Sequence, residues 1–354
     1  MKWLEGWNDR IILAVDHTQL QGVVYKLPVL LTIDSALIDF SKVQDDGADI
    51  RLVPANHSKL LPYEFEVFDK GNGIMKLWVL LDALPTNVPT FFFLYYNNPS
   101  AEPGEDPAAL WSGCNCVLCM HFKPNDLFAD STGLNTISSN SGSTVTSTEG
   151  PIGTSWDVNT NSEAIFPYID AYHLNMWTFE FYGYQKTTSI YWNGIMGTRF
   201  GSDYTFDAKI KNDSNKNIHK ARIDVGDGSG WIHYEDYGQN VLVEWVHMGF
   251  TVDSSIKRLS YFQNGSRTDG YNYSSGVPLF MKSNQTLHVG RSRPASGEYG
   301  RWIMEELRIF SDVKTNAWMN ASYKAFQNQL VVYDQSTVTD MIPKPIAVFH
   351  GITF

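Results

Sequence analysis

Hydrophobic and polar residues alternate clearly in the stretch from Val241 to Gly270. Within residues 245–253 the apolar positions recur at every second place, which is the period of a strand with one buried face. A second alternating segment, residues 258–263, ends at Asn264-Gly265, a pair that suits the left-handed positions of a tight hairpin turn. Two antiparallel strands of this kind need a second sheet over their apolar face, so the stretch predicts a β-sandwich.

Similar alternating segments, separated by turn residues, recur along most of the chain and divide it into parts. Residues 1–103 and 108–333 each predict a β-sandwich unit, joined by a short acidic linker at 104–107. Only residues 314–327 predict a helix. Residues 334–354 are interpreted as an arm that docks on a neighbouring chain or on the first unit, with a last strand of this chain as the alternative. The chain is therefore expected to be all-β, with one short helix near its C-terminus.

The composition agrees with deep β-sheet cores and narrows the range of partners. Aromatic residues make up 14% of the 354 residues, whereas charged residues make up only 18%. A net charge of -11, without a cluster of lysines and arginines, argues against a nucleic-acid partner. No apolar run is long enough for membrane insertion, and no secretory signal follows Met1. We therefore expect a protein made in a host cytoplasm and incorporated into a virion, with a cell-surface or extracellular location as the alternative.

Three cysteines, Cys114, Cys116 and Cys119, form a C-x-C-x-x-C cluster close to His121. Such a cluster could be half of a metal site, but the chain has no second cysteine pair to complete it. Packing inside a β-strand is the favoured interpretation. The odd number of cysteines also argues against a disulfide framework.

Glu64 and Glu66 share one face of a predicted strand, as the paired acids of some glycosidases do. Phe65 and Val67 already provide the apolar face of that strand. We therefore interpret the two glutamates as part of a solvated outer face, with a catalytic pair as the less favoured alternative.

An ordered series of short motifs runs through the first hundred residues. The motifs are Trp7, Arg10, LPVL at 27–30, DGADIR at 46–51, LPYEFE at 61–66, Trp78-Val79 and YYNNP at 95–99. With these motifs, residues 1–100 resemble a bacterial and phage domain of unknown function that often precedes laminin-G-like modules in surface proteins. The resemblance implies no activity, because none is established for that domain.

A second ordered series follows in the second unit. Its motifs are VLCMHF at 117–122, DSTG at 130–133, GPIG at 150–153, Trp156, WTFEF at 177–181, Trp245-Val246-His247, Asn264-Gly265, EELRIF at 305–310 and WMNASY at 318–323. With this series, residues 108–333 resemble a laminin-G-like, concanavalin A-like jelly roll.

The second resemblance implies a possible calcium ion. In that family the Asp of the D-S-x-G turn and an acid near the last strand often share the ion, and by match these are Asp130 and Glu305. Carboxylate oxygens from a bent loop suit calcium. Glu305 stands where the family usually has Asp, and Asp130 could instead cap its own turn, so both interpretations stay open.

Six aromatic residues of the second unit fall in or beside predicted loops. They are Trp231, Tyr234, Tyr237, Tyr271, Tyr273 and Tyr299. Rings in such places can stack on sugar faces, while nearby Asp227, Glu235, Asp236 and Arg293 can bind hydroxyl groups. The alternative is that these rings cover the core at loop bases or pack against a neighbouring subunit.

Motifs of common hydrolases are absent from the sequence. The second unit has no E-x-D-x-E strand, and the chain has no G-x-S-x-G and no H-E-x-x-H. We therefore expect a non-enzymatic virion protein, of the phage tail or capsid-decoration kind. Its lectin-like module would bind a carbohydrate or the host surface, beside other virion proteins or copies of itself. A purely structural virion component is the alternative, and a polysaccharide hydrolase or lyase is the third hypothesis.

Overall fold

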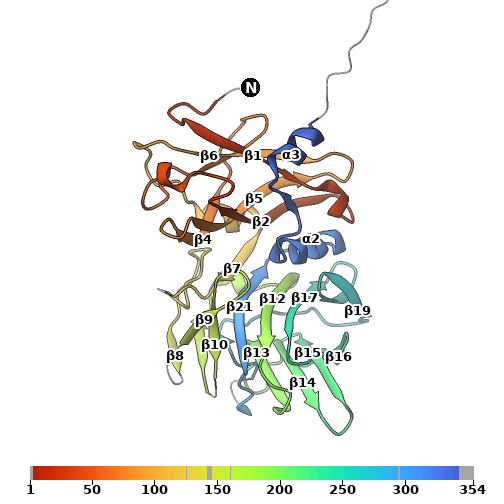
Figure 1. Cartoon of the computed structure of the whole chain (residues 1–354). Coiled ribbons are helices and arrows are strands. Elements are labelled where there is room, and N and C mark those ends of the chain that lie inside the picture. The colour runs from red at the N-terminus through yellow and green to blue at the C-terminus, as the bar shows by residue number, and fades with distance from the viewer. Residues whose placement is uncertain (1–2, 125, 142–145, 160, 294–295, 343–354) are drawn as a thin grey trace, which may run out of the picture.

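The computed structural model describes residues 3–124, 126–141, 146–159, 161–293 and 296–342 and contains four antiparallel sheets. Two smaller sheets form a first unit at one end of the molecule, and two larger sheets form a second unit at the other end (Figure 1). The fold is therefore all-β and built from sandwich-like units, as the sequence predicted.

The first unit pairs a four-stranded sheet, in the order β22-β1-β6-β3, with a three-stranded sheet, in the order β2-β5-β4. Apolar side chains of both sheets, such as Leu13, Leu31 and Leu77, are fully buried in one cluster. The strands are β1 (Asp9–Val15), β2 (Val24–Asp34), β3 (Arg51–Pro54), β4 (Tyr63–Asp69), β5 (Ile74–Leu84), β6 (Thr90–Tyr96) and β22 (Val331–Val332).

The second unit pairs an eight-stranded sheet with a seven-stranded sheet. The first has the order β19-β18-β17-β12-β21-β10-β9, with β7 also pairing β21, and the second has the order β16-β15-β14-β13-β20-β11-β8. The strands are β7 (Cys116–Met120), β8 (Ser139–Ser141), β9 (Thr146–Glu149), β10 (Thr154–Val158), β11 (Glu163–Pro167), β12 (Trp177–Gln185), β13 (Trp192–Gly197), β14 (Phe206–Asp213), β15 (Ile218–Gly226), β16 (Trp231–Tyr237), β17 (Trp245–Asp253), β18 (Arg258–Gln263), β19 (Ser266–Asn272), β20 (Thr286–Val289) and β21 (Trp302–Phe310).

The alternating stretch at residues 241–270 forms the meander β17-β18-β19. Asn264 and Gly265 join β18 to β19 with φ angles of +49° and +73°, which only a few residue types adopt easily. The predicted strands and their turn are therefore confirmed.

Three α-helices lie among the described residues: α1 (Pro107–Gly113), α2 (Asn316–Phe326) and α3 (Gln335–Met341). The sequence predicted α2, which begins after Thr315, whose hydroxyl accepts a hydrogen bond from Trp318 N at 3.1 Å. The other two helices were not predicted. No helix in the described part of the chain is long and apolar enough to cross a membrane.

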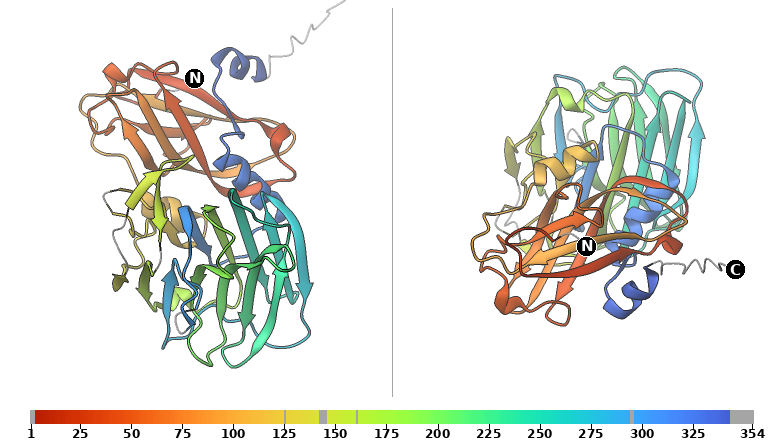
Figure 2. Two further views of the ribbon diagram at one scale, coloured as in Figure 1. Left: turned by 60° about the horizontal axis from the view of Figure 1, so that its bottom comes forward. Right: turned by 90° about the horizontal axis from the view of Figure 1, so that it is seen from above.

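The two units pack directly against each other, with α2 at the junction (Figure 2). The apolar cluster of the first unit continues through Trp111 of α1 and Trp318 of α2 to Tyr182 and Phe262 of the second unit. One hydrophobic core therefore spans the junction, and the relative position of the units depends on it.

The chain returns to the first unit after α2. Strand β22 joins the sheet of β1, with Ala14 opposite Val332, although residues 331–332 were expected to belong to the second unit. Gln335 of α3 then binds the backbone N and O of Ile12 at 3.3 and 3.0 Å. The predicted arm therefore docks on the first unit through α3, and residues 343–354 lie outside the described residues.

Candidate functional site

The structure divides the six aromatic residues predicted to bind a ligand into two groups. Trp231 and Tyr234 lie on β16, Tyr271 lies on β19 and Tyr299 lies in the loop before β21; all four are at least partly exposed. The second group is Tyr237 and Tyr273, which are only 2% and 5% exposed and belong to the core. Their inclusion in the ligand set was wrong, since a ring buried in the core cannot stack on a ligand from solution.

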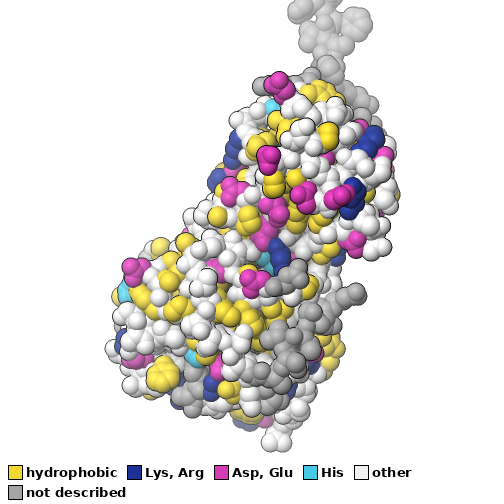
Figure 3. Space-filling view, turned by 90° about the vertical axis from the view of Figure 1, so that its left-hand side faces the viewer, with side chains coloured by type: hydrophobic (Ala, Val, Ile, Leu, Met, Phe, Trp, Pro, Cys, Tyr) yellow, Lys and Arg dark blue, Asp and Glu magenta, His cyan; other side chains and the backbone are white. Residues whose placement is uncertain are grey.

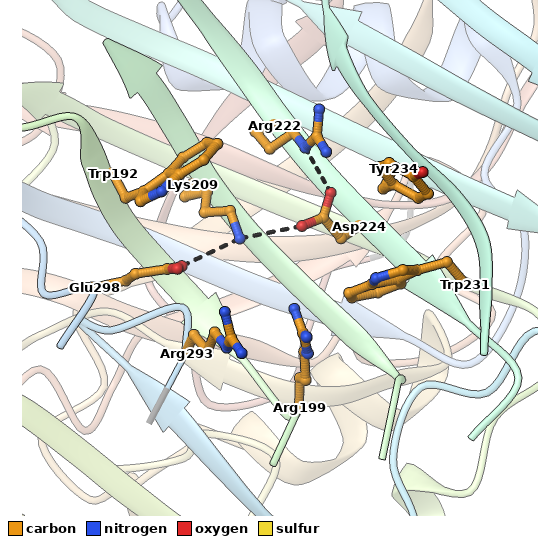
Figure 4. Close-up of a pocket in the computed structure, with 9 residues that line it drawn as sticks. All are labelled: Trp192, Arg199, Lys209, Arg222, Asp224, Trp231, Tyr234, Arg293 and Glu298. Carbon is orange, nitrogen blue, oxygen red and sulfur yellow. Dashed lines mark hydrogen bonds and ion pairs between the residues drawn. The ribbon is translucent and has the colours of Figure 1, made fainter. Parts of the chain in front are cut away.

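A small pocket lies on the seven-stranded sheet, on the face opposite the core residues Ala208, Ile210 and Ile223 (Figure 4). Its volume of about 180 Å³ is below the 300–1,000 Å³ typical of pockets for drug-sized ligands, so it suits a single sugar residue or a similar group. The pocket is lined by Trp192, Arg199, Lys209, Arg222, Asp224, Trp231, Tyr234, Arg293 and Glu298.

The two aromatic residues of β16 reach the pocket together because the strand contains an irregularity. Tyr234 pairs with Asp224 and His233 pairs with Val225, but Trp231 pairs with Gly226, so Ile232 is an extra residue. In a regular strand, Trp231 and Tyr234 would point to opposite faces. The bulge turns both toward the pocket, where their ring centroids are 6.1 Å apart.

Lys209 of β14 organises the charges at the bottom of the pocket. Its Nζ lies 2.6 Å from Asp207 Oδ1 and 3.1 Å from a carboxylate oxygen of both Asp224 and Glu298. Burial alone would lower the pKa of Lys209, but the three carboxylates outweigh burial and hold that pKa above its usual range. Lys209 is therefore a fixed cation that ties two strands to the loop of Glu298.

Two glycines of β13 allow that loop to lie on the sheet. A Cβ on Gly194 would lie 2.1 Å from the backbone O of Glu298, and one on Gly197 would lie 1.8 Å from that of Ser292. The loop carries Arg293 and Glu298 into the pocket. The pocket therefore requires that Gly194 and Gly197 have no side chain.

Gly194→Ala is expected to displace this loop and to lower stability by about 1–3 kcal/mol, the usual cost of overpacking. Gly230→Ala is the matched control, because a Cβ there would meet no atom within 4 Å. Urea unfolding would measure both variants. Equal stability of the two variants would contradict the role given to Gly194.

A second hollow adjoins the first across Trp231. Trp231, Tyr271 and Gly276 are among its lining residues, and Tyr271 stacks on His233 with ring centroids 3.7 Å apart. The exposed rings of β16 and β19 therefore form one continuous surface around Trp231. Tyr299 lies outside both hollows and packs under Arg291, 4.2 Å from its guanidinium carbon.

The junction holds a second polar group, in which Glu64 and Glu66 are only 4% and 8% exposed. Their interpretation as a solvated face was wrong. Phe65 does face the first unit, but the opposite face of β4 is covered by the second unit. There Glu64 binds Lys123 Nζ at 2.5 Å, and both glutamates approach His121, at 3.3 and 3.2 Å. Figure 3 shows acidic side chains beside a basic one at the waist between the units.

His121 lies at the centre of this junction group. Its Nδ1 is 2.6 Å from Glu306 Oε1, and its Nε2 is 3.4 Å from Cys119 Sγ. Burial alone would lower the pKa of His121, but Glu306, Glu64 and Glu66 outweigh burial and raise that pKa to about 10. His121 is therefore the cation that the surrounding glutamates share.

The three cysteines are buried and unbridged. Cys119, His121 and Glu306 each bring one possible ligand atom within 4.8 Å of the others. Both ring nitrogens of His121 also lie close to carboxylates, which fits an ion-pair network. Burial of the cysteines fits the favoured interpretation of strand packing.

The predicted calcium ligands have separate partners. Asp130 accepts hydrogen bonds from the backbone N of Cys119 and Thr132, both at 3.0 Å, and therefore caps its own turn. Glu305 Oε1 accepts from the backbone N of Ile152 and Gly153, at 2.6 and 2.8 Å. Burial raises the pKa of Glu305 to about 8. A shared calcium ion stays a prediction, and calorimetry with calcium would test it.

Sequence reasoning missed most of the charged residues of the pocket. A signal was present, because Asp207 and Lys209 on one strand, and Arg222 and Asp224 on the next, are opposite charges two residues apart. Residues at this spacing share a strand face, so two adjacent strands of this kind predict a charged sheet surface.

Comparison with known proteins supports the first resemblance for part of the chain. The family model of a domain of unknown function, DUF2341, matches residues 46–145. The match begins and ends later than the expected range of 1–100, and it runs past β7 into the second unit. No curated protein matches the chain.

Among solved structures, the chain is similar to domain 4 of AbnA, a GH43 extracellular arabinanase from Geobacillus stearothermophilus, solved in complex with arabinotriose. Identity is 18%, the TM-score is 0.45, and the match covers 59% of this chain and 98% of that domain. The binding domain of botulinum neurotoxin DC, solved with SialylT, gives 11% identity and a TM-score of 0.45. That match covers 60% of this chain and only 52% of the other. At these identities and scores, no ligand or activity transfers to this chain.

Proposed function

We propose that this protein is a non-enzymatic binding protein whose second unit holds a carbohydrate at the pocket of the seven-stranded sheet. The main observation is that the β16 bulge turns Trp231 and Tyr234 into one pocket beside hydrogen-bonding side chains. Aromatic faces that stack on sugar rings, together with polar groups that bind hydroxyls, are what a carbohydrate site requires.

The arrangement of the carboxylates supports binding rather than hydrolysis. Glycosidases place two carboxyl groups on either side of the scissile bond, with free space between them. Here Lys209 Nζ lies between Asp224 and Glu298, 3.1 Å from each. An ammonium group therefore occupies the place that a substrate bond would need.

Trp231→Ala and Tyr234→Ala are each expected to weaken binding of any glycan that the full chain selects from a printed array by about 2- to 10-fold, since a stacked aromatic ring contributes about 0.5–1.5 kcal/mol. Trp3→Ala is a matched control, because Trp3 is an exposed ring under an arginine in the first unit, at 4.2 Å, just as Trp231 is at 4.5 Å. Calorimetry with the selected glycan would measure the effect. If no glycan is bound, or if all three variants bind equally, a structural role takes the place of this proposal.

We further propose that the molecule is displayed on a virion, as a tail or capsid-decoration protein, with the cell surface as the alternative. The packed junction supports display, because it holds the two units in a fixed relation and leaves the pocket at the far end of the second unit. Mass spectrometry of purified virus particles would test this placement. If the protein is absent from the particles, the placement is refuted.

A further inference from the structure

More cations than carboxylates line the pocket, although the whole chain is acidic. Four cationic side chains line it against two carboxylates. The cations are Arg199, Lys209, Arg222 and Arg293, and the carboxylates are Asp224 and Glu298.

Both lining carboxylates are already used within the protein. Lys209 holds the two of them, and Arg222 Nε binds Asp224 Oδ1 at 2.7 Å. Arg222 also reaches Asp236, whose oxygen lies 3.2 Å from Nη1. Lys209 and Arg222 therefore each have carboxylate oxygens within 3.2 Å, with Asp207 as a further partner of Lys209. Among the described residues, Arg199 and Arg293 have no carboxylate oxygen that close.

Arg199 and Arg293 are the two cations that remain. The Nε of each is buried and has no hydrogen-bond acceptor among the described residues. Arg199, which is only 9% exposed, has Nη1 3.9 Å from Asp207 Oδ2, at the outer limit of an ion pair. Both guanidinium groups point into the same space beside Trp231 (Figure 4). Buried donors of a cation are costly to leave unpaired, so this space is suited to an anion.

We infer that the sugar held here is acidic and carries a carboxylate or a sulfate group that Arg199 and Arg293 bind. This inference rests on the proposed carbohydrate binding at the same pocket. A guanidinium presents two parallel N–H donors that match the oxygens of such a group. The Arg199 guanidinium carbon lies 4.5 Å from the centre of the Trp231 ring, so a group bound by Arg199 would lie beside that ring.

The acidity of the chain does not oppose this assignment. At physiological ionic strength, charges farther away than about 8 Å are largely screened. The net charge of -11 is spread over the whole molecule, whereas Arg199 and Arg293 are in the pocket wall. The local charges therefore decide which ligand binds.

The experiment screens the full chain on an array of neutral, carboxylated and sulfated glycans. Calorimetry then compares each acidic glycan that binds with its uncharged counterpart, the methyl ester for a carboxylate and the desulfated form for a sulfate. The acidic form is expected to bind about 10- to 100-fold more tightly, as for hydrogen bonds to a charged group. The two pairs of compounds distinguish carboxylate from sulfate.

Arg293→Gln is expected to abolish this preference, and Arg199→Gln is expected to reduce it in the same direction. Arg267→Gln, on the exposed face of β19, should leave the preference intact. Melting temperatures of all three variants show whether the fold is preserved, and Arg293, on a loop, is the variant least coupled to the core.

If only neutral glycans bind, or if charged and uncharged forms bind equally, the inference is overturned while the proposed function stands. If no glycan on the array binds, both are overturned. A preference for acidic glycans that persists in Arg293→Gln and Arg199→Gln would also overturn the assignment of these arginines.

Discussion

Replacing Arg308 with methionine is expected to lower the free energy of unfolding by about 3–5 kcal/mol, because it removes one partner from a buried ion-pair group. Arg308 is fully buried on β21, and its Nη2 binds Glu306 Oε2 at 2.8 Å. Nη1 lies 3.5 Å from Glu180 Oε2. Methionine fills a similar space but leaves both carboxylates buried with fewer donors.

The same guanidinium also joins the two units. Its carbon lies 4.2 Å from the ring centre of Trp78 on β5, 4.7 Å from that of Trp111 on α1 and 4.9 Å from that of Phe326 on α2. Cation–π contacts of desolvated groups add to the ion pairs, so the loss should be at the upper end of the range. The junction should loosen before either sandwich unfolds.

Urea unfolding followed by tryptophan fluorescence would measure the change, with Arg267→Met as the control. Arg267 is exposed on β19, so its replacement should stay within about 0.5 kcal/mol of the parent. In Arg308→Met, Glu306 still has His121 as a partner, at 2.6 Å, so a double-mutant cycle with Glu306→Gln would show how much of the loss passes through Glu306. If Arg308→Met is as stable as the control, the guanidinium makes no net contribution to the free energy of unfolding.

Local patterns predicted most of the fold. The alternation in residues 245–263 located β17 and β18, and the apolar spacing of 314–327 located α2. Helix α1 was missed although its signal is present, because Asp106 caps it and Pro107 stands at its first turn. Strand β22 has two residues and pairs with a strand more than 300 positions away, so no local pattern could place it.

The junction group and the pocket could be predicted only in part, for three physical reasons. The period of β4 correctly separated Phe65 from Glu66, but a single strand carries no information on what covers its outer face. In β16 the same period would separate Trp231 from Tyr234, and only the bulge brings them together. The third reason is the order of the strands in the sheet, which the sequence does not reveal. The pocket joins four neighbouring strands to a loop from elsewhere in the sequence.

The junction should also make stability depend on pH through Glu66. Burial raises the pKa of Glu66 from 4.5 to about 7, with the nearby Glu306 adding to the rise and His121 opposing it. Glu66 Oε2 is 3.2 Å from both Trp78 Nε1 and His121 Nδ1, whereas Oε1 has no hydrogen-bond partner among the described residues. The carboxylate form is therefore poorly supported in the folded protein.

The sign of the effect follows from the direction of this shift. A group whose pKa is higher in the folded state contributes stability that is fully present below its unfolded pKa, here 4.5, and is lost as the pH rises through about 7. Glu64 acts in the opposite direction. Burial would raise its pKa, but His121 and Lys123 hold that pKa well below its usual range, so its contribution is lost only in acid. Between pH 5 and 8, Glu66 therefore changes its charge, and Glu305, whose pKa burial raises to about 8, begins to do so at the upper end of this range.

Glu66→Gln keeps the shape of the side chain and removes this titration. We expect the variant to unfold at a higher temperature than the parent at pH 8, where the parent must hold an ionised Glu66 beside Glu306. At pH 5 the two should differ little, because Glu66 is then protonated in the parent.

Glu102→Gln serves as the control, since Glu102 is exposed in the linker region and should shift neither melting temperature. Calorimetric melting at both values of pH gives the result directly. A Glu66→Gln variant that is less stable than the parent at pH 8 would mean that Glu66 acts there as a partner of His121, and the assignment of a destabilising charge would be wrong.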